Sequence, residues 1–487
     1  MERLNFTTRQ SIGFQFLMDQ MTANTVYGSD RIKQVIPYGR NETDRLLTEY
    51  EEIESLIAAM NRNDSELSKV ELVLMFIKEI RGSIRNLQEM SLNDIELFEL
   101  KNFLIQVEKL FPLFEEWNQK LGLKTVWFQD VKKVLDLLDP DEKRIPSFYI
   151  SDHYSNELKE VREQKKRMEV ALRQELSEEK RQEFVAIRMK AVATEAELEQ
   201  EIRIQISNQL KPFLPLFLES IDMVGRLDFL IQKAKLAIKF QGCKPIITKD
   251  VVQLVEVIHP ELDTILREKE KRFTPISIEM NQGVTVLTGA NMGGKSVALR
   301  TVFLNLYLAQ CGFYPYGNKV CIPVFDSMTL IAEEYQSMKD GLSSFGGEII
   351  ALKDALGMSD SGFGFLMMDE LARGTNPDEG AAIVKAVVKY CNPKNQMTLL
   401  ATHYDHIAEH ANAHYQVFGL KNMDMDKIKQ QIAMEKDQNR VSFISKCMNY
   451  GIYKVTQIQD CPKDAFNVCK LLGLQEEVIS YMEQDLL

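Results

Sequence analysis

The chain has 487 residues, of which 45% are hydrophobic and 27% are charged, and its formal net charge is −12. This length is too great for one compact core and fits about three domains. The composition excludes a wholly disordered or collagen-like chain, and the acidic balance excludes nucleic-acid binding by bulk electrostatics, which needs a basic surface.

Neither the start of the chain nor its longest apolar stretch suggests secretion or a membrane partner. Residues 1–5 lack the apolar segment of a signal peptide. The stretch 212–230 is interrupted by Glu219, Asp222 and Arg226, so no membrane span is expected. Seven scattered cysteines without a Cys-x-x-Cys pair favour reduced thiols, and we expect a cytoplasmic protein.

Glycine divides the chain into two parts. Only seven of the 24 glycines lie in residues 1–270, and none lies between Gly122 and Gly225. A long stretch rich in Glu, Lys, Leu, Arg and Gln without glycine predicts long helices. The predicted helical segments are a core at 1–150, an arm at 151–210, and a returning lever and linker at 211–265.

Residues 157–203 predict an exposed antiparallel helical arm that turns back between Leu176 and Gln182. Approximate heptad spacing runs through Leu158, Val161, Lys165, Met168 and Leu172. The segment holds twelve acidic and eleven basic residues, whereas an arm that grips phosphates should be net positive. Two interpretations stay open: a solvated helix pair with a structural role, and an arm that contacts a partner.

The remaining segment, 266–487, alternates between strand and helix patterns, which predicts a layered α/β domain. The apolar runs that predict strands are Val284–Thr288, Phe365–Met368, Met397–Ala401, Val417–Leu420 and Val441–Ile444, and helical spacing occupies Lys295–Gln310. Two short helices are expected near 463–472 and 475–485.

A glycine-rich motif joins the first of these strands to the helix that follows. Gly289-Ala290-Asn291-Met292-Gly293-Gly294-Lys295-Ser296 fits the pattern G-x-x-x-x-G-K-[ST]. Glycines let backbone N–H groups surround a phosphate. Lys295 would reach the β- and γ-phosphates, and Ser296 would supply a hydroxyl to Mg²⁺. The motif therefore predicts ATP and Mg²⁺ as ligands.

Two later strands end in residues that suit phosphate chemistry. Phe365–Met368 carries Asp369 to a strand end, where it would hold Mg²⁺, and Glu370 would act as the general base on a water molecule. His403 follows the strand at Leu399–Ala401 and would sense the γ-phosphate. The other histidines of this region, His406, His410 and His414, are expected in surface helices or loops.

These motifs resemble the MutS family of ABC-like ATPases. The Asn-Met-Gly-Gly inside the phosphate loop, the run Asp369–Thr375, the run Ala401–Tyr404 and His259-Pro260 are all similar to that family. The resemblance is specific over 250–487 and weaker over 1–250. It implies an ATP hydrolase with an α/β P-loop NTPase fold of the ABC-like, MutS C-terminal type, preceded by an all-α core and lever domain with a helical arm.

The resemblance also implies a homodimer in which each nucleotide is completed by the opposite subunit. The matching segment is Gly341–Glu348, in which Ser343 would approach the partner's γ-phosphate. Asn291 would contact the nucleotide by the same comparison. The terminal helices around Ala465, Val468 and Leu471–Leu474 resemble a dimerisation element, although a small helical cap on the sheet is an equal alternative.

The sequence departs from the family pattern in the loop after Glu370 and in the N-terminal part of the chain. The family usually has glycine at Ala372 and aspartate at Glu379, and Asn376-Pro377 replaces a small hydroxyl pair. Residues 11–17 already look like the start of the helical core. We therefore expect a short form that lacks the mismatch-recognition and connector domains and that also lacks a nuclease tail.

Three functions remain open at this point. The first, implied by the family resemblance, is that the dimer uses ATP to move its helical arms on DNA without mismatch specificity. Alternatively, it is an ATP-dependent chaperone that reactivates a cobalamin-dependent amino-acid mutase, since short MutS-like ATPases resemble the ATPase component of such factors. An inactive scaffold is disfavoured because Lys295, Ser296, Asp369, Glu370 and His403 are all present.

Overall fold

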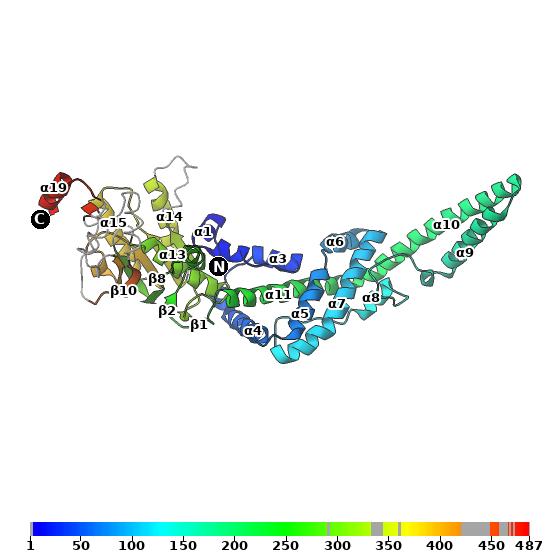
Figure 1. Ribbon diagram of the computed structural model, residues 1–487, viewed down its shortest axis with the longest axis horizontal. Coiled ribbons are helices and arrows are strands. Elements are labelled where there is room, and N and C mark those ends of the chain that lie inside the picture. Colours follow the sequence, from blue (N-terminus) through cyan, green and yellow to red (C-terminus); the bar gives the residue numbers. More distant parts are fainter. Residues whose placement is uncertain are drawn as a thin grey trace. The chain divides into compact units, whose positions relative to one another are not determined.

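The computed structural model describes residues 3–289, 293–332, 344–358, 362–419, 449–456, 466, 469–470 and 473–486 (Figure 1). The chain divides into two compact units. Unit 1 comprises Met1–Met21, Val35–Glu54 and Lys233–Leu487, and unit 2 comprises Thr22–Gln34 and Ser55–Gln232. Two helices, α4 (Thr43–Asn61) and α11 (Leu214–Lys239), contribute residues to both units. The finer division into core, arm, lever and ATPase segments stays a prediction.

Unit 2 is helical, as the sparse glycines predict. Besides its parts of α4 and α11, it contains α3 (Val26–Lys33), α5 (Ser65–Phe76), α6 (Arg81–Glu89), α7 (Asp94–Leu121), α8 (Lys132–Leu138), α9 (Asn156–Gln174) and α10 (Glu178–Leu210). Helix α7 begins at a capping box formed by Asn93 and Glu96 and ends at Gly122, whose φ of 69° suits glycine. It buries Phe103, Phe114 and Trp117, and thus supplies much of the core of unit 2.

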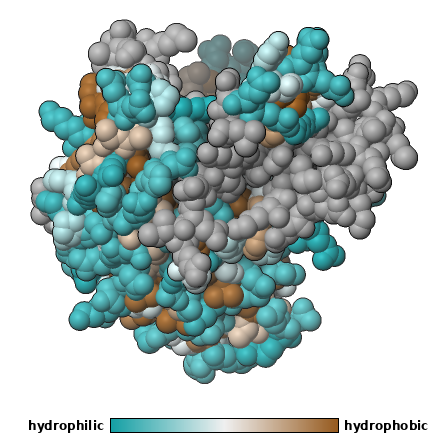
Figure 2. All heavy atoms as spheres, turned by 90° about the vertical axis from the view of Figure 1, so that its left-hand side faces the viewer, coloured by the Kyte–Doolittle hydropathy of each residue, from teal (hydrophilic) through white to brown (hydrophobic). Residues whose placement is uncertain are grey.

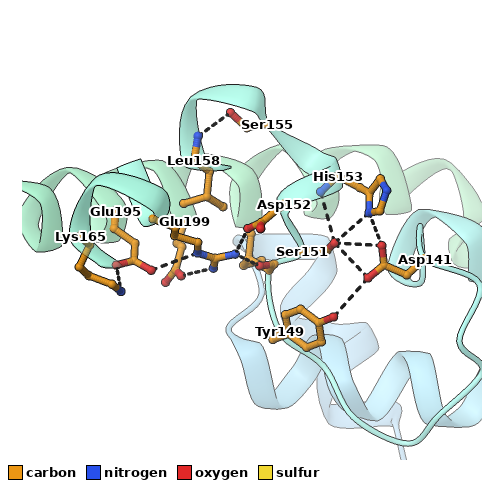
Figure 3. Close-up of polar contacts among 12 residues, drawn as sticks. Asp141, Tyr149, Ser151, Asp152, His153, Ser155, Leu158, Lys165, Glu195 and Glu199 are labelled. Atoms are coloured by element: carbon orange, nitrogen blue, oxygen red, sulfur yellow. Dashed lines mark hydrogen bonds and ion pairs between the residues drawn. The ribbon is translucent and has the colours of Figure 1, made fainter. Parts of the chain in front are cut away.

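Within the predicted arm, the expected pair of helices is confirmed as α9 and α10, which pack against each other (Figure 1). The turn lies at residues 175–177, slightly earlier than predicted, because Ser177 precedes a helical first turn that carries Glu178 and Glu179. Many charges of the arm pair with one another. Arg162 contacts Glu195 at 3.1 Å and Glu199 at 2.8 Å, as part of the cluster drawn in Figure 3.

Further pairs extend this network at the base of the arm. Lys165 pairs with Glu195, and Arg162 also contacts Asp152 at 2.6 Å. Farther along the arm, Arg188 contacts Glu169 at 3.0 Å. The balanced composition of the arm therefore has a structural use, since these opposite charges hold its two helices together.

Unit 1 contains two sheets. The larger has the order β10-β9-β4-β8-β7-β6 and is parallel except for β10. Its strands are β4 (Gly283–Thr288), β6 (Ser327–Ile331), β7 (Gly364–Asp369), β8 (Gln396–Ala401), β9 (Ala413–Gly419) and β10 (Asn449–Lys454). The smaller has the order β1-β5-β2-β3, with β1 (Ile246–Ile247), β2 (Val251–Val257), β3 (Ile276–Asn281) and β5 (Lys319–Ile322). Strands β4 and β8 are wholly buried, which explains their unbroken apolar character.

The helices of unit 1 include α1 (Phe6–Ser11), α2 (Phe14–Asp19), α12 (Pro260–Glu268), α13 (Lys295–Gln310), α14 (Ser344–Met358), α15 (Pro377–Cys391) and α19 (Glu476–Leu486). The predicted helix over 295–310 and the helix near 475–485 are confirmed. The predicted strand Val441–Ile444 and most of the predicted helix near 463–472, including Ala465, Val468 and Leu471, lie outside the described residues.

The N-terminal helices of unit 1 pack against α12 and α13. Phe14 is fully buried, with its ring centroid 5.0 Å from that of Tyr307, so this residue is core packing as the sequence predicts. Gly13 has a φ of 77°, and a Cβ there would lie 2.4 Å from the ring of His259. His259 caps α12, and burial lowers its pKa to about 4, which keeps the imidazole neutral.

At the end of unit 1 that carries α15 and α19, the described surface is mostly hydrophilic, with scattered hydrophobic residues (Figure 2). Among the residues that the structure describes, no helix combines the length and the apolar character needed to cross a membrane.

Candidate functional site

The predicted site residues that the structure describes lie at one edge of the larger sheet. Strands β4 and β7 both pair in parallel with β8, with Leu287 and Asp369 each opposite Ala401. Parallel strands present their carboxyl ends at the same edge, and this is where ligands bind in open α/β sheets. Gly289, Glu370 and His403 therefore follow three neighbouring strand ends.

The glycine-rich motif leads directly into helix α13, which begins at Lys295. Gly294 caps this helix with a φ of 90°, and a Cβ there would lie 2.8 Å from the Tyr450 ring. Gly289 also has a positive φ, of 153°. Both positions therefore favour glycine for a conformational reason. Gly293 is buried, while Ala290, Asn291 and Met292 lie outside the described residues.

Lys295 is 4% exposed and already has partners inside the site. Its Nζ donates a hydrogen bond to the Gly289 carbonyl at 2.8 Å and lies 3.2 Å from Glu370 Oε1. A buried ammonium needs such partners, because desolvation of an unpaired charge is costly. The pair brings together two residues that the sequence assigns to phosphate binding and to catalysis.

Asp369 ends β7 as a largely buried carboxyl group. Burial raises its pKa, while a hydrogen bond from Ser296 opposes that shift. Its Oδ1 has no hydrogen-bond partner among the described residues. A buried carboxylate oxygen without a partner is a ligand suited to a hard cation, and the Ser296 hydroxyl lies beside it.

Glu370 is held at the strand end by its backbone and by two cations. Its φ is 49°, and its N–H donates to the Ala401 carbonyl at 3.1 Å. The carboxylate contacts Lys295 on one oxygen and Arg373 at 3.4 Å on the other. Arg373 was not among the predicted site residues, although it lies in the run Asp369–Thr375, three residues after Glu370.

His403 lies close to this group, directly after β8. Burial lowers its pKa, which favours the neutral imidazole, although the nearby Glu370 carboxylate acts in the opposite direction. Its Nδ1 is buried and has no hydrogen-bond partner in the described part of the chain. The preceding residue, Thr402, donates its N–H to the Leu287 carbonyl at 3.1 Å and so fixes the backbone here.

The expectation that His414 lies on the surface is wrong. This residue is on the buried strand β9 and is 8% exposed. Its Nε2 lies 2.8 Å from Thr288 Oγ1, at the residue just before the glycine-rich motif. The pairing of β9 with β4 buries this histidine.

A cavity of about 570 Å³ opens beside Gly294. Its wall includes Phe273, Tyr450 and Val297, and the cations Lys271 and Arg272 also line it. No sequence pattern predicts this cavity, because its lining comes from segments that are far apart in the chain.

Comparison with known proteins finds similarity to the MutS family. Residues 285–472 match the family model of MutS domain V. This segment is therefore a MutS-type domain V, and the chain is similar to MutS proteins over most of its length. It is 25% identical to the DNA mismatch repair protein MutS of Thermodesulfovibrio yellowstonii over 480 residues, which cover 91% of this chain and 54% of that protein.

Two further MutS-family proteins match over shorter regions. The DNA mismatch repair protein MutS of Bacillus licheniformis is 26% identical over 285 residues, covering 57% of this chain and 31% of that protein. Endonuclease MutS2 of Geobacillus kaustophilus is 32% identical over 189 residues, covering 38% of this chain and 23% of that protein. The chain thus spans about half or less of the length of these MutS proteins.

The loop after Glu370 explains one departure from the MutS pattern. Ala372 has a φ of 64°, a conformation in which glycine, the usual MutS residue here, avoids the strain of a side chain. Its carbonyl accepts a hydrogen bond from the Tyr404 hydroxyl at 3.0 Å, and its N–H donates to Glu348 Oε1 at 3.1 Å. These two bonds hold the alanine in place.

The segment that resembles the trans-acting part of MutS proteins is described only from α14 onward. Gly341, Leu342 and Ser343 lie outside the described residues. Glu348, on α14, accepts the hydrogen bond from the Ala372 N–H, so this helix packs on the loop that follows Glu370.

Proposed function

We propose that this chain binds ATP with Mg²⁺ and hydrolyses it, using a P-loop NTPase fold of the ABC-like type. The observation that carries the proposal is the convergence of Lys295, Asp369, Glu370 and His403 at the N-terminus of α13. Two buried atoms there, Asp369 Oδ1 and His403 Nδ1, have no hydrogen-bond partner among the described residues. A helix N-terminus and a buried ammonium together form an anion-binding site.

Nucleotide binding would rearrange the ion pair between Lys295 and Glu370. A phosphate that enters the glycine-rich loop competes with the carboxylate for the Lys295 ammonium, since both are anionic acceptors. Glu370 is then released from one of its two cations and is free to accept a proton from water. In this scheme, the pair suppresses the general base until the phosphate arrives.

Ser296 and Asp369 would hold Mg²⁺, since a hydroxyl and a carboxylate oxygen are the ligand types that this ion prefers. When bound, the ion would neutralise charge that develops on the phosphate oxygens. His403, neutral because it is partly buried, can donate or accept one hydrogen bond near the terminal phosphate. The aromatic cavity beside Gly294 would take the nucleoside part of ATP by stacking on Phe273 or Tyr450.

We further propose that the active form is a homodimer in which Ser343 acts on the partner's nucleotide. Mixing Ser343→Ala chains with Lys295→Ala chains should then restore ATP hydrolysis, because one site of each mixed dimer has both residues. At equal amounts, about a quarter of the wild-type rate is expected, since half of the dimers are mixed and each has one working site. Hydrolysis is measured by phosphate release.

Each variant alone serves as the control and should be inactive. A mixture with no more activity than the two variants separately, under conditions where the chains exchange, would show that Ser343 does not act in trans.

The client of the arm is proposed to be DNA, bound without mismatch specificity, by analogy with relatives whose names include DNA mismatch repair. We expect matched duplex, mismatched duplex and four-way junction to bind at low salt, with no preference for the mismatch, in gel-shift assays. Binding should weaken steeply as salt rises, because it depends on phosphate contacts. No binding to any of the three at low salt would refute this client.

One observation favours a protein client instead. On α10, Val185, Met189 and Val192 recur at helical spacing and are 40%, 65% and 41% exposed. Apolar side chains attract an amphipathic helix better than they attract phosphates. Refuted DNA binding would therefore favour the chaperone hypothesis, of which the amino-acid mutase client stays a prediction.

A further inference from the structure

The C-terminal end of α13, opposite the proposed phosphate site, is held by donors from other parts of unit 1. The last carbonyls of a helix lack partners within it and must find other donors. Here the donor–acceptor pairs are Tyr50 Oη to the Ala309 carbonyl at 2.6 Å, Tyr38 N to the Gln310 carbonyl at 2.8 Å, and Lys233 Nζ to the Cys311 and Gly312 carbonyls at 3.1 Å each. We name Tyr38, Glu49, Tyr50 and Lys233 the α13 clamp.

The centre of the α13 clamp is a buried ion pair. Lys233 Nζ lies 2.6 Å from Glu49 Oε1, and the two side chains are 2% and 0% exposed. The Tyr38 hydroxyl donates to Glu49 Oε2 at 3.1 Å, and the Lys233 ammonium lies 4.4 Å from the centroid of the Phe313 ring. Since removing one member of such a pair leaves a buried charge uncompensated, its geometry is strongly fixed.

The clamp and the phosphate site lie at the two ends of one helix. Helix α13 has 16 residues, a length of about 24 Å, and is almost entirely buried after its first turn. A packed helix moves as a unit, so a shift of Lys295 at one end changes the hydrogen bonds of the carbonyls at the other. Glu49 belongs to α4 and Lys233 to α11, and both helices continue along the chain into residues of unit 2.

We propose that Glu49 and Lys233 are positioning residues for the nucleotide site: the α13 clamp and nucleotide binding are energetically coupled through α13. This inference rests on the proposed ATP binding and names a regulatory route to the same site. Coupling is reciprocal, so the clamp favours the nucleotide-competent position of Lys295, and bound nucleotide stabilises the clamp and the helices α4 and α11 that form it.

The first test compares nucleotide affinity in Lys233→Met and wild type, by calorimetry with a non-hydrolysable ATP analogue and Mg²⁺. We expect a fall in affinity of about fivefold or more, the usual lower range of such coupling. A second readout is amide hydrogen exchange over 43–61 and 214–239. The analogue should slow this exchange in wild type and lose that effect in the variant, which a purely structural role of Lys233 would not predict.

The matched control is Lys101→Met. Lys101 has the same chemistry in unit 2: its Nζ lies 2.9 Å from Asp139 Oδ1 and donates to the Ser147 carbonyl at 2.9 Å, with side-chain exposures of 6% and 3% for the pair. Because Lys101 belongs to unit 2 and is not part of the α13 clamp, Lys101→Met should leave nucleotide affinity unchanged. An equal loss in both variants, or no loss in Lys233→Met, would overturn the inference.

Two further results would also decide the inference. If Lys233→Met does not fold, Glu49→Gln decides, because it removes the charge and keeps the size of the side chain; unchanged affinity and unchanged exchange in Glu49→Gln overturn the inference. If the wild type itself does not bind the analogue, the proposed ATP binding is wrong. This result differs from equal binding by the wild type and Lys233→Met, which would contradict only the coupling.

Discussion

Replacement of Lys295 by alanine is expected to abolish measurable nucleotide binding. The side chain is 4% exposed at the start of α13 and is the buried cation closest to Glu370 in the described structure. Charge-assisted hydrogen bonds contribute about 1.5–3 kcal/mol each, so losing two of them should raise the Kd by about a hundredfold or more. Titration with a fluorescent ATP analogue measures this Kd.

The control for this variant is Lys394→Ala, which removes a lysine that lies over the Tyr390 ring and precedes the amino end of β8, away from the carboxyl ends of the strands. It should bind the analogue like wild type. Wild-type affinity in Lys295→Ala would mean that the glycine-rich motif does not hold a phosphate.

Replacement of Glu370 by alanine is expected to separate binding from hydrolysis. The variant keeps Lys295, Ser296 and Asp369, and it removes the carboxylate that competes for the Lys295 ammonium, so ATP should bind at least as tightly as in wild type. Loss of a general base lowers the rate by about 10²–10⁴-fold. Single-turnover phosphate release measures the chemical step directly.

Glu379→Ala provides the matched control, since this glutamate lies in the first turn of α15 and contacts Thr375 rather than the site. It should hydrolyse ATP normally. Normal hydrolysis in Glu370→Ala would show that another group activates the water.

The parts of the fold and site that could be predicted are those with a local cause. The glycine-rich motif dictates its own backbone, and unbroken apolar runs such as 365–368 are typical of buried parallel strands. The apolar runs before Asp369 and His403 were enough to predict that both residues follow strand ends, whereas the position of β8 between β4 and β7 comes from the structure.

The parts that could not be predicted depend on tertiary packing. The burial of His414 follows from the pairing of β9 with β4, which its own sequence does not specify. Ala372 adopts a positive φ only because Tyr404 and Glu348 hold its carbonyl and its N–H. The α13 clamp joins residues 184 positions apart, Glu49 and Lys233, and no periodicity in the sequence indicates that contact.

The internal ion pairs of the arm affect how salt titrations must be interpreted. Arg162, Glu195 and Glu199 remain partly accessible to solvent, so added electrolyte screens their attraction as well as any attraction to a polyanion. A fall in binding with ionic strength then combines displaced counterions with a looser helix pair. Circular dichroism of the protein alone over the same range tests whether its helices stay intact, which is a condition for interpreting the slope of log K against log salt as a number of neutralised phosphates.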